Sequence, residues 1–259
     1  MEIKILKKLS LKSPIMLAGA PGMGLVAKHT VDYFIKKLCA KELGRLSSDY
    51  DYYSIAVFDD RGVLEPCHLN SQYRFYFLRA KGAHDFVFFT ADFQPTLPEK
   101  QNELSDIVAK VSEKLKVKRI YTTAAVPVRE KVAHPKVFGT ATAPELMDFL
   151  VKKGIEPLRG RVSGFNGVLL EYAWKRGIEA CCLLAETYIY HIDNPLDPID
   201  FKAVLAVTNK ISELMECDID TEELEREIER REALYKKLEE EYKKAVAPKI
   251  RKEVPSYIG

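Results

Sequence analysis

The segment Pro14-Ile-Met-Leu-Ala-Gly-Ala-Pro-Gly-Met-Gly-Leu25 passes directly from a strand pattern to a helix pattern. Residues 14–18 form a short apolar run that predicts a strand, and the glycines of Gly19–Leu25 permit a sharp turn. From about residue 25 to residue 38, apolar side chains then recur at helical spacing. A strand that leads straight into a helix is the repeating unit of an α/β sheet, so this segment sets the fold class.

The same alternation continues along the chain. Asp85–Ala91 is apolar at almost every position, which is typical of a strand buried on both faces. Pro98 suits the first turn of a helix, because a proline there loses no needed hydrogen bond. Further strands are expected at 3–9, 54–58, 63–64, 73–78, 118–123, 137–138 and 178–185, with a hairpin at 59–62, and further helices at 98–115, 144–151, from 167 to Gly177, and at 198–214. We therefore predict a largely parallel sheet covered by helices on both faces.

Composition narrows the class of protein. The 259 residues carry a formal net charge of +2, which does not indicate a nucleic-acid or membrane partner. No apolar stretch approaches the ~20 residues that span a bilayer, and the start of the chain lacks a signal-peptide pattern, so we expect a cytoplasmic protein. The five cysteines have no metal-ligand spacing, and Cys181-Cys182 reads as a reduced pair in a buried strand. We predict neither a metal nor a cofactor.

The composition changes after Cys217, and we predict a core domain at 1–216 followed by a C-terminal helix and tail at 217–259. Residues 220–246 are dense in charge, with Asp220 as the expected cap. The apolar positions alternate at spacings of four and three, with Arg231 in the one gap: Leu224, Ile228, Tyr235, Leu238, Tyr242 and Ala245. This seam fits a helix packed on its own core, or one that packs on another subunit or projects. We favour the second alternative.

Four short turns each follow a strand-like run or a short loop: Gly19–Leu25, Ala91–Pro95, Gly164–Leu170 and Ala185–Tyr188. We expect them at one rim of the sheet, where ligands of α/β proteins usually bind. They contribute the candidate rim-pocket residues Gly22, Gly24, Asp92, Gln94, Asn166 and Glu186. Glycines before a helix can cradle an anion, and carboxylates with amides can bind a metal or transfer protons. The same residues can equally be tight turns and hydrogen-bonded structural groups. We favour the structural interpretation, because the glycine spacing matches neither a dinucleotide nor a nucleotide phosphate loop. No catalytic residue is predicted.

Taken in order, five motifs are similar to those of one family: Gly19–Leu25, Asp92–Pro95 with Gln101–Leu104, Ala141–Leu146, Gly164–Gly167 and Glu186-Thr187. Over about residues 14–235 the chain resembles the proteasome assembly chaperone 2 family, particularly its archaeal members. The resemblance implies a three-layer α/β/α sandwich, similar to nucleoside phosphorylases, without enzymatic activity. It also implies homo-oligomers, here a tetramer or pentamer, and binding to proteasome α subunits or α rings through C-terminal segments.

Some family members end in a hydrophobic residue, a tyrosine and any residue, and that tail inserts between α subunits. This chain ends Val254-Pro-Ser-Tyr257-Ile-Gly259, so its tyrosine stands one place earlier. We therefore expect modest affinity rather than gate opening. The expected partner contacts of the C-terminal segment are Leu224, Ile228, Leu238, Tyr242, Lys249, Arg251, Lys252 and Tyr257. The hypothesis is a non-enzymatic, ATP-independent chaperone. The alternative is a binding protein or enzyme that takes nucleoside-like or phosphorylated ligands at the rim.

Overall fold

A computed structural model describes residues 2–5, 9–47, 57–58, 61–65, 73–188 and 198–250. The chain divides into two compact units, Met1–Ile219 and Asp220–Gly259. The first unit contains the sheet and five α-helices among its described residues, and the second contains one long helix. Each of the two units is compact by itself.

The strands of the first unit that lie in one sheet are β1 (Glu2–Ile5), β2 (Ile15–Gly19), β3 (Lys41–Ser47), β6 (Tyr73–Leu78), β7 (Phe86–Ala91), β8 (Arg119–Val128), β9 (Val137–Ala141), β10 (Glu156–Pro157) and β11 (Glu179–Tyr188). Within the described residues their order across the sheet is β1-β3-β6-β7-β2-β8-β11-β9-β10. A separate short antiparallel pair joins β4 (Val57–Phe58) to β5 (Leu64–Glu65).

The centre of this mixed sheet is parallel. Ile15 of β2 lies opposite Phe86 of β7 on one side and opposite Arg119 of β8 on the other. β11 runs parallel to β8, so the carboxyl ends of these four strands face the same rim. The flanking pairs β6–β7 and β9–β11 are antiparallel. The parallel centre confirms the predicted α/β fold class and carries the candidate site.

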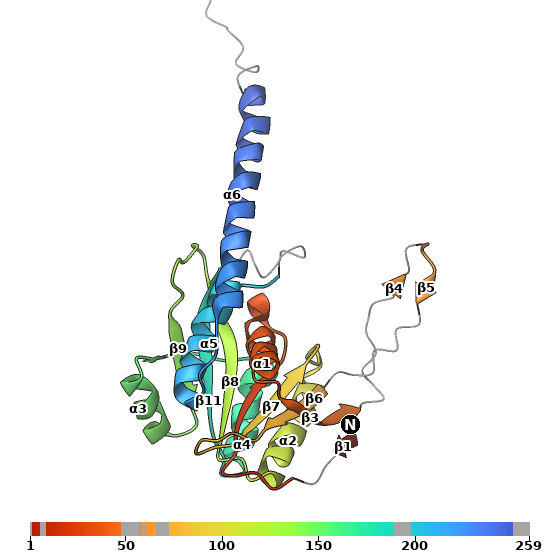
Figure 1. Cartoon of the computed structure of the whole chain (residues 1–259), viewed down its shortest axis with the longest axis vertical. Helices are drawn as coiled ribbons and strands as arrows, with labels where there is room; N and C mark the ends of the chain where they lie inside the picture. The colour runs from red at the N-terminus through yellow and green to blue at the C-terminus, as the bar shows by residue number, and fades with distance from the viewer. Residues whose placement is uncertain are drawn as a thin grey trace, which may run out of the picture. The chain divides into compact units, whose positions relative to one another are not determined.

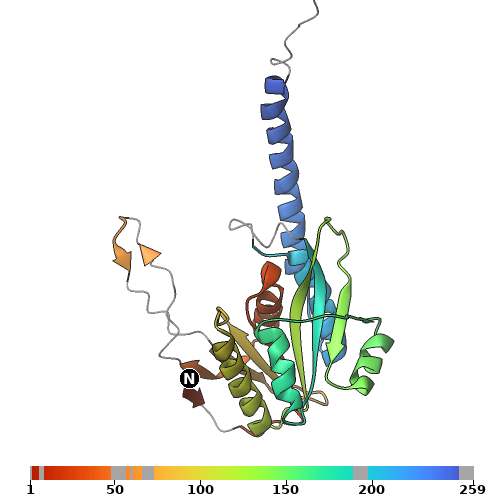
Figure 2. The same cartoon turned by 180° about the vertical axis from the view of Figure 1, so that it is seen from behind.

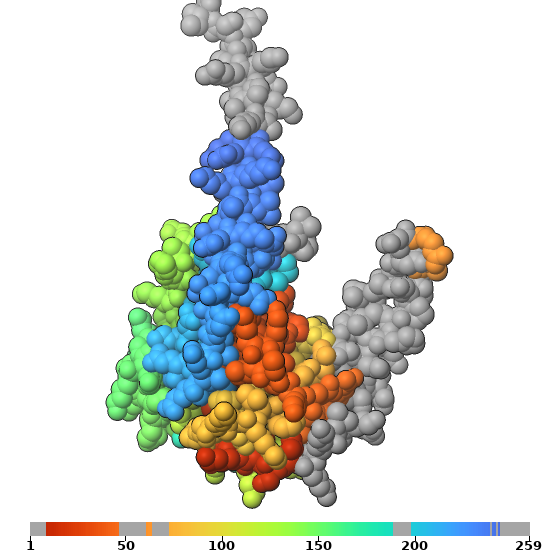
Figure 3. Space-filling model, viewed as in Figure 1, coloured from red at the N-terminus to blue at the C-terminus, as the bar shows by residue number. Residues whose placement is uncertain are grey.

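The helices are α1 (Val26–Lys37), preceded by the short helix η1 (Met23–Leu25), α2 (Pro98–Lys114), α3 (Pro144–Lys152), α4 (Phe165–Trp174) and α5 (Phe201–Met215). α1 and α5 lie side by side on one face of the sheet (Figures 1 and 3). α2 and α4 cover the other face (Figure 2), where Met16 and Ala18 join Leu104 and Phe165 in one buried cluster. Two helical layers around one sheet confirm the predicted three-layer sandwich.

Local signals placed most elements correctly. Pro98 and Pro144 are the first residues of α2 and α3, as predicted. α4 ends at Trp174, three residues before the predicted stop, and Gly177 (φ +67°) donates its N–H to the Trp174 carbonyl. The predicted strand residues 6–8 and 54–56, and residues 59–60 of the predicted hairpin, lie outside the described residues. Strand β3 was not predicted.

The cysteine prediction is confirmed for the pair in β11. Cys181 and Cys182 are both fully buried and unbridged. Burial raises the pKa of both thiols, that of Cys182 to about 12, so both side chains are neutral at physiological pH. They act as small core residues, with Cys181 on the face of β11 opposite to that of Cys182.

In the second unit, α6 (Glu222–Ile250) is one continuous helix. It begins two residues after the predicted cap, and Asp220 accepts a hydrogen bond from the Glu222 N–H at 3.0 Å. Leu224 is buried, with 3% of its surface exposed, whereas Leu234 and Leu238 are 50% and 49% exposed. The middle of the helix therefore presents two leucines to solvent.

Candidate functional site

The turn from β2 into α1 requires glycine at position 24. Gly24 and Leu25 both have positive φ, +57° and +47°, a conformation that residues other than glycine adopt only at a cost in free energy. A Cβ atom at Gly24 would lie 2.8 Å from Cγ2 of Thr187 at the end of β11. Glycine is thus needed here for the backbone conformation and for close packing between the turn and β11.

Asn166, in the first turn of α4, binds the same turn from the other side. Its Oδ1 accepts a hydrogen bond from the Ala20 N–H at 2.9 Å, and its Nδ2 donates to the Ala20 carbonyl at 3.0 Å. The side chain is buried, and a Cβ atom at Gly22 would lie 3.8 Å from Nδ2. Both ends of the amide are therefore engaged by backbone, so Asn166 joins α4 to the end of β2.

Gln94 joins the turn after β7 to the start of α4. Its Oε1 accepts a hydrogen bond from the Phe165 N–H at 3.1 Å. That N–H belongs to the first residue of α4 and has no partner within the helix. A Cβ atom at Gly164 (φ +77°) would lie 2.9 Å from the same oxygen. Gln94 therefore caps α4, and the close approach explains the glycine beside it.

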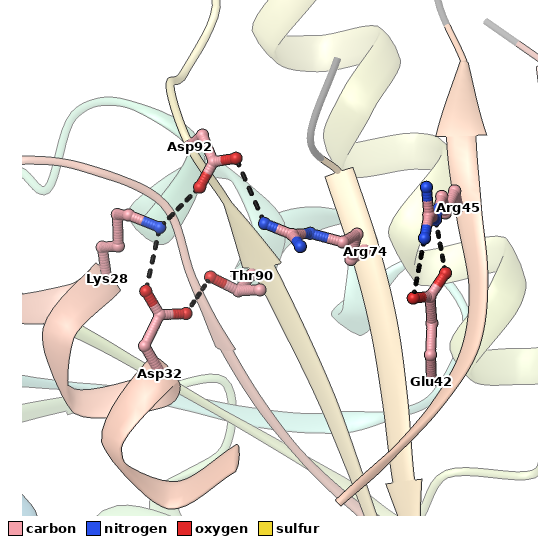
Figure 4. A network of polar contacts seen from close by, with 7 residues as sticks. All are labelled: Lys28, Asp32, Glu42, Arg45, Arg74, Thr90 and Asp92. Atoms are coloured by element: carbon pink, nitrogen blue, oxygen red, sulfur yellow. Dashed lines mark hydrogen bonds and ion pairs between the residues drawn. The ribbon is translucent and has the colours of Figure 1, made fainter. Parts of the chain in front are cut away.

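Asp92 lies in a network of charged side chains at the end of β7 (Figure 4). Its carboxylate accepts from Lys28 Nζ at 2.7 Å and from Arg74 Nη2 at 3.2 Å. Lys28 also pairs with Asp32 at 2.9 Å, and Asp32 accepts from the Thr90 hydroxyl at 2.6 Å. The network links α1, β6 and β7, and it sets two cations against two carboxylates.

The protonation state of Lys28 follows from these contacts. Burial lowers the pKa of Lys28, but its hydrogen bonds to Asp92 and Asp32 outweigh burial, and the net pKa is raised above 10.5. Lys28 is therefore a cation at neutral pH and compensates the carboxylates beside it. In Figure 4 the neighbouring Glu42–Arg45 pair on β3 is drawn apart from this network.

Glu186, at the end of β11, is bonded elsewhere. Its carboxylate accepts from the Lys136 N–H at 2.9 Å, and its own N–H donates to the Lys136 carbonyl at 3.0 Å. These bonds fasten the loop between β8 and β9. Gly22, Gln94 and Asn166 thus meet at the start of α4, Asp92 joins Lys28 and Arg74, and Glu186 contacts Lys136. The shared pocket stays a prediction.

Asp200 was missed by the sequence reasoning. It is buried, its Oδ1 caps α5 by accepting from the Ala203 N–H at 3.1 Å, and its own N–H donates to the Gly24 carbonyl at 3.0 Å. Its Oδ2 accepts a longer bond from the Tyr188 N–H at 3.4 Å. The signal was an aspartate directly before a helical pattern, which marks a helix cap. The predicted helix began at Pro198 and passed over it.

The chemical capacity of this rim is limited by these bonds. Asn166, Gln94, Glu186 and Asp200 each accept hydrogen bonds from backbone N–H groups, and Asn166 has both ends of its amide bonded to the Ala20 backbone. Among the described residues, no group of three or more His, Cys, Asp or Glu side chains is arranged to hold a metal ion. Within the same residues, no helix is long and apolar enough to cross a membrane.

Comparison with known proteins identifies the family. The sequence profile of the PAC2 family matches residues 16–239, so the chain belongs to this family. Two relatives from Methanocaldococcus jannaschii are similar over almost their full length. The uncharacterized protein MJ0106 is 29% identical over 252 residues, covering 97% of this chain and 95% of that protein. The uncharacterized protein MJ1210 is 27% identical over 244 residues, covering 92% and 89%.

Solved structures of similar proteins share the fold. Pyrococcus furiosus PbaB, described as an archaeal proteasome activator, superposes with a TM-score of 0.77 at 24% identity, covering 92% of this chain and 98% of PbaB. P. furiosus PbaA, described as an archaeal homolog of proteasome-assembly chaperone, superposes with a TM-score of 0.73 at 21% identity, and the superposition covers 99% of each chain. Mycobacterium tuberculosis Rv2125, described as a proteasome-assembly chaperone homologue, gives 0.68 at 17% identity and covers 86% and 94%. The family and the fold predicted from the sequence are both confirmed.

Proposed function

We propose that this chain is a non-enzymatic, ATP-independent proteasome assembly chaperone homologue that binds proteasome α subunits or α rings, partly through residues 217–259. One observation carries the proposal: the PAC2 match extends to residue 239 and thus includes more than half of α6. The proposal includes a homo-oligomer, a tetramer or pentamer, in the cytoplasm, with no nucleic-acid or membrane partner.

The described part of α6 supports a role in binding. Leu238 is half exposed on a helix whose other exposed positions are mostly charged, and solvent-exposed leucines in such a setting favour a partner. Leu224 is buried, so the apolar contact in the proposal rests chiefly on Leu238. The side chains of Tyr242 and Lys249, and the whole of Arg251, Lys252 and Tyr257, lie outside the described residues. Their roles remain proposals from the sequence.

A non-enzymatic role is supported by the rim. The PAC2 family is chaperone-like and is not a known family of enzymes. Both ends of the Asn166 amide are bonded to the Ala20 backbone, and the Asp92 carboxylate is paired with Lys28 and Arg74, which gives these two rim residues structural roles. We therefore propose no cofactor and no catalytic residue. No observation at the rim favours the alternative, a protein for nucleoside-like or phosphorylated ligands.

The direct test is titration of purified proteasome α rings, and separately of α subunits, with the full chain. We expect binding that weakens with salt, because exposed charges are screened within about 10 Å at 0.1 M ionic strength. Leu238→Asp and Tyr257→Ala should each weaken it, and Ala233→Asp, an exposed change elsewhere on α6, is the matched control. If the full chain binds neither rings nor subunits, the chaperone assignment is wrong. If binding is unaffected by Leu238→Asp, the role of α6 in it is wrong.

A further inference from the structure

The charged side chains of α6 are unevenly distributed around the helix. We define the seam as the positions that repeat at spacings of four and three: Leu224, Ile228, Arg231, Tyr235 and Leu238 among the side chains described. The flanks are the positions next to the seam on either side, and the outer face comprises the remaining positions. Four of the five described flank positions are glutamate, and the fifth is leucine: Glu225, Glu227, Glu232, Leu234 and Glu241.

The outer face carries charges of both signs. Its described residues are Arg226, Arg230, Lys236, Lys237 and Lys243 against Glu222, Glu223, Glu229 and Glu240, with the neutral Ala233. Arg230 reaches back to Glu227, with Nη2 and Nε at 2.7 and 2.9 Å from its carboxylate oxygens. The described flanks of the seam therefore carry acidic side chains, apart from Leu234, and one of these, Glu227, is paired with Arg230 and with Arg231 of the seam.

The apolar surface that is open to a partner lies near the middle of the helix. Leu238 of the seam and Leu234 of one flank are half exposed, and Tyr235 of the seam is partly exposed between them. Glu232 and Glu241, which border this stretch, are both exposed. An apolar patch of about two helical turns is thus framed by carboxylates.

This arrangement disfavours pairing of α6 with a second copy of itself. In a parallel pair of helices, the flank on one side of the seam faces the opposite flank of the partner. In an antiparallel pair, each flank faces its own equivalent. Because the described flanks are glutamate at all positions but one, both orientations set like charges against each other. A second copy would also bring a second Arg231 into the apolar seam.

We propose that the seam of α6 docks on an apolar groove or helix of a different protein whose borders carry Lys or Arg side chains. The reason is charge complementarity, since such a surface buries Leu234 and Leu238 and faces the glutamates. This inference deepens the proposed function and rests on its claim that the C-terminal segment binds a partner. Self-association of the chain then depends on residues 1–219 and not on α6.

The test uses the full chain and two charge variants with the same change in net charge. Glu232→Lys with Glu241→Lys reverses the flanks, and Glu229→Lys with Glu240→Lys reverses the outer face as the matched control. Lysine is a good helix former, and circular dichroism should show unchanged helix content in both. The first probe is the purified proteasome α ring. We expect the flank variant to bind it roughly tenfold more weakly, because each reversed pair changes affinity severalfold, and the control to change about twofold at most.

The second probe needs no proteasome. The flank variant supplies a helix with a basic border. Mixing it with wild type should therefore give pairs of α6 helices, detected by chemical cross-linking, that neither protein forms alone. The control variant mixed with wild type should give none, and Leu238→Asp in the wild-type partner should abolish the pairs. By analytical ultracentrifugation, the mass of wild type and of Leu238→Asp should be equal.

The outcomes separate the two proposals. If α rings do not bind at all but the mixed helices pair, the proposed function fails and the charge rule for α6 holds. Equal binding of the flank and control variants to the ring overturns the docking inference, as does absence of mixed pairs. If Leu238→Asp lowers the mass of the wild-type oligomer, α6 pairs with itself and the inference is wrong.

Discussion

Asn166→Ala tests whether the rim is structural. In this variant the N–H and carbonyl of Ala20 lose the partners that now lie at 2.9 and 3.0 Å. Ala20 is fully buried, so water cannot readily replace them. Leaving a buried polar group unpaired costs about 1–3 kcal/mol, and two such groups give about 2–6 kcal/mol. In a unit of this size each kcal/mol lowers the melting temperature by about 2–4 °C, so we expect a decrease of at least about 4 °C and up to about 24 °C.

The assay is urea unfolding followed by circular dichroism, with thermal melts in parallel. Asn102→Ala is the matched control, because Asn102 also donates to a backbone carbonyl, that of Pro98 at 2.9 Å, but on the exposed side of α2. We expect it to change the free energy of unfolding by about 0.5 kcal/mol or less. Asn166→Asp keeps an acceptor for the Ala20 N–H and loses the donor, so it should also destabilise. If Asn166→Ala is no more destabilising than Asn102→Ala, the structural interpretation of the rim is wrong.

Three further predictions concern the same unit. Gly24→Ala should lower the free energy of unfolding by about 1–3 kcal/mol, because residue 24 has a positive φ and its new Cβ would contact Thr187. Adding Thr187→Ser removes the contacting methyl group and should recover the part of this loss that comes from the clash. If urea unfolding shows no recovery in the double variant, the contact is contradicted. Glu186→Gln should cost about 1 kcal/mol, because a neutral acceptor replaces a charged one for the Lys136 N–H, and an unchanged midpoint would remove this role. The pKa of Lys28 is raised in the folded state, so the stability that its charge provides is complete below pH 10.5 and is lost as pH rises through the higher folded pKa. The melting temperatures of wild type and Lys28→Met should therefore converge between about pH 9 and 11.5. A constant difference between the two proteins over this range would refute the prediction.

The sequence predicted those parts of the fold that depend on local signals. Pro98 and Pro144 marked helix starts because proline at the first helical position needs no partner. Strand β3 was missed because Lys-Glu-Leu-Gly-Arg-Leu-Ser lacks the β-branched and aromatic residues typical of strands. Its conformation is set by pairing with β1 and β6, which no local pattern records.

The candidate site shows the same limit at the level of side chains. The glycines and polar residues of the turns indicated that the strand ends are special, but not what binds them. Asn166 and Ala20 are far apart in the sequence, and their reciprocal hydrogen bonds depend on where the start of α4 meets the end of β2. Asp200 was missed for a similar reason, because only its bond to Ala203 is local.

The hydrogen bonds at the ends of the central strands favour a search for the partner-binding surface elsewhere on the chain. At the ends of the central strands, Asn166, Gln94 and Asp200 hold backbone groups of neighbouring segments. α6 has the opposite character, since Leu238 of its seam and Leu234 of one flank are half exposed beside acidic side chains. A surface gains binding energy chiefly from apolar groups that are exposed before binding and buried after it. The rim bonds therefore stabilise the fold, and we propose that the property that distinguishes one partner from another, namely charge around an apolar patch, is carried by α6.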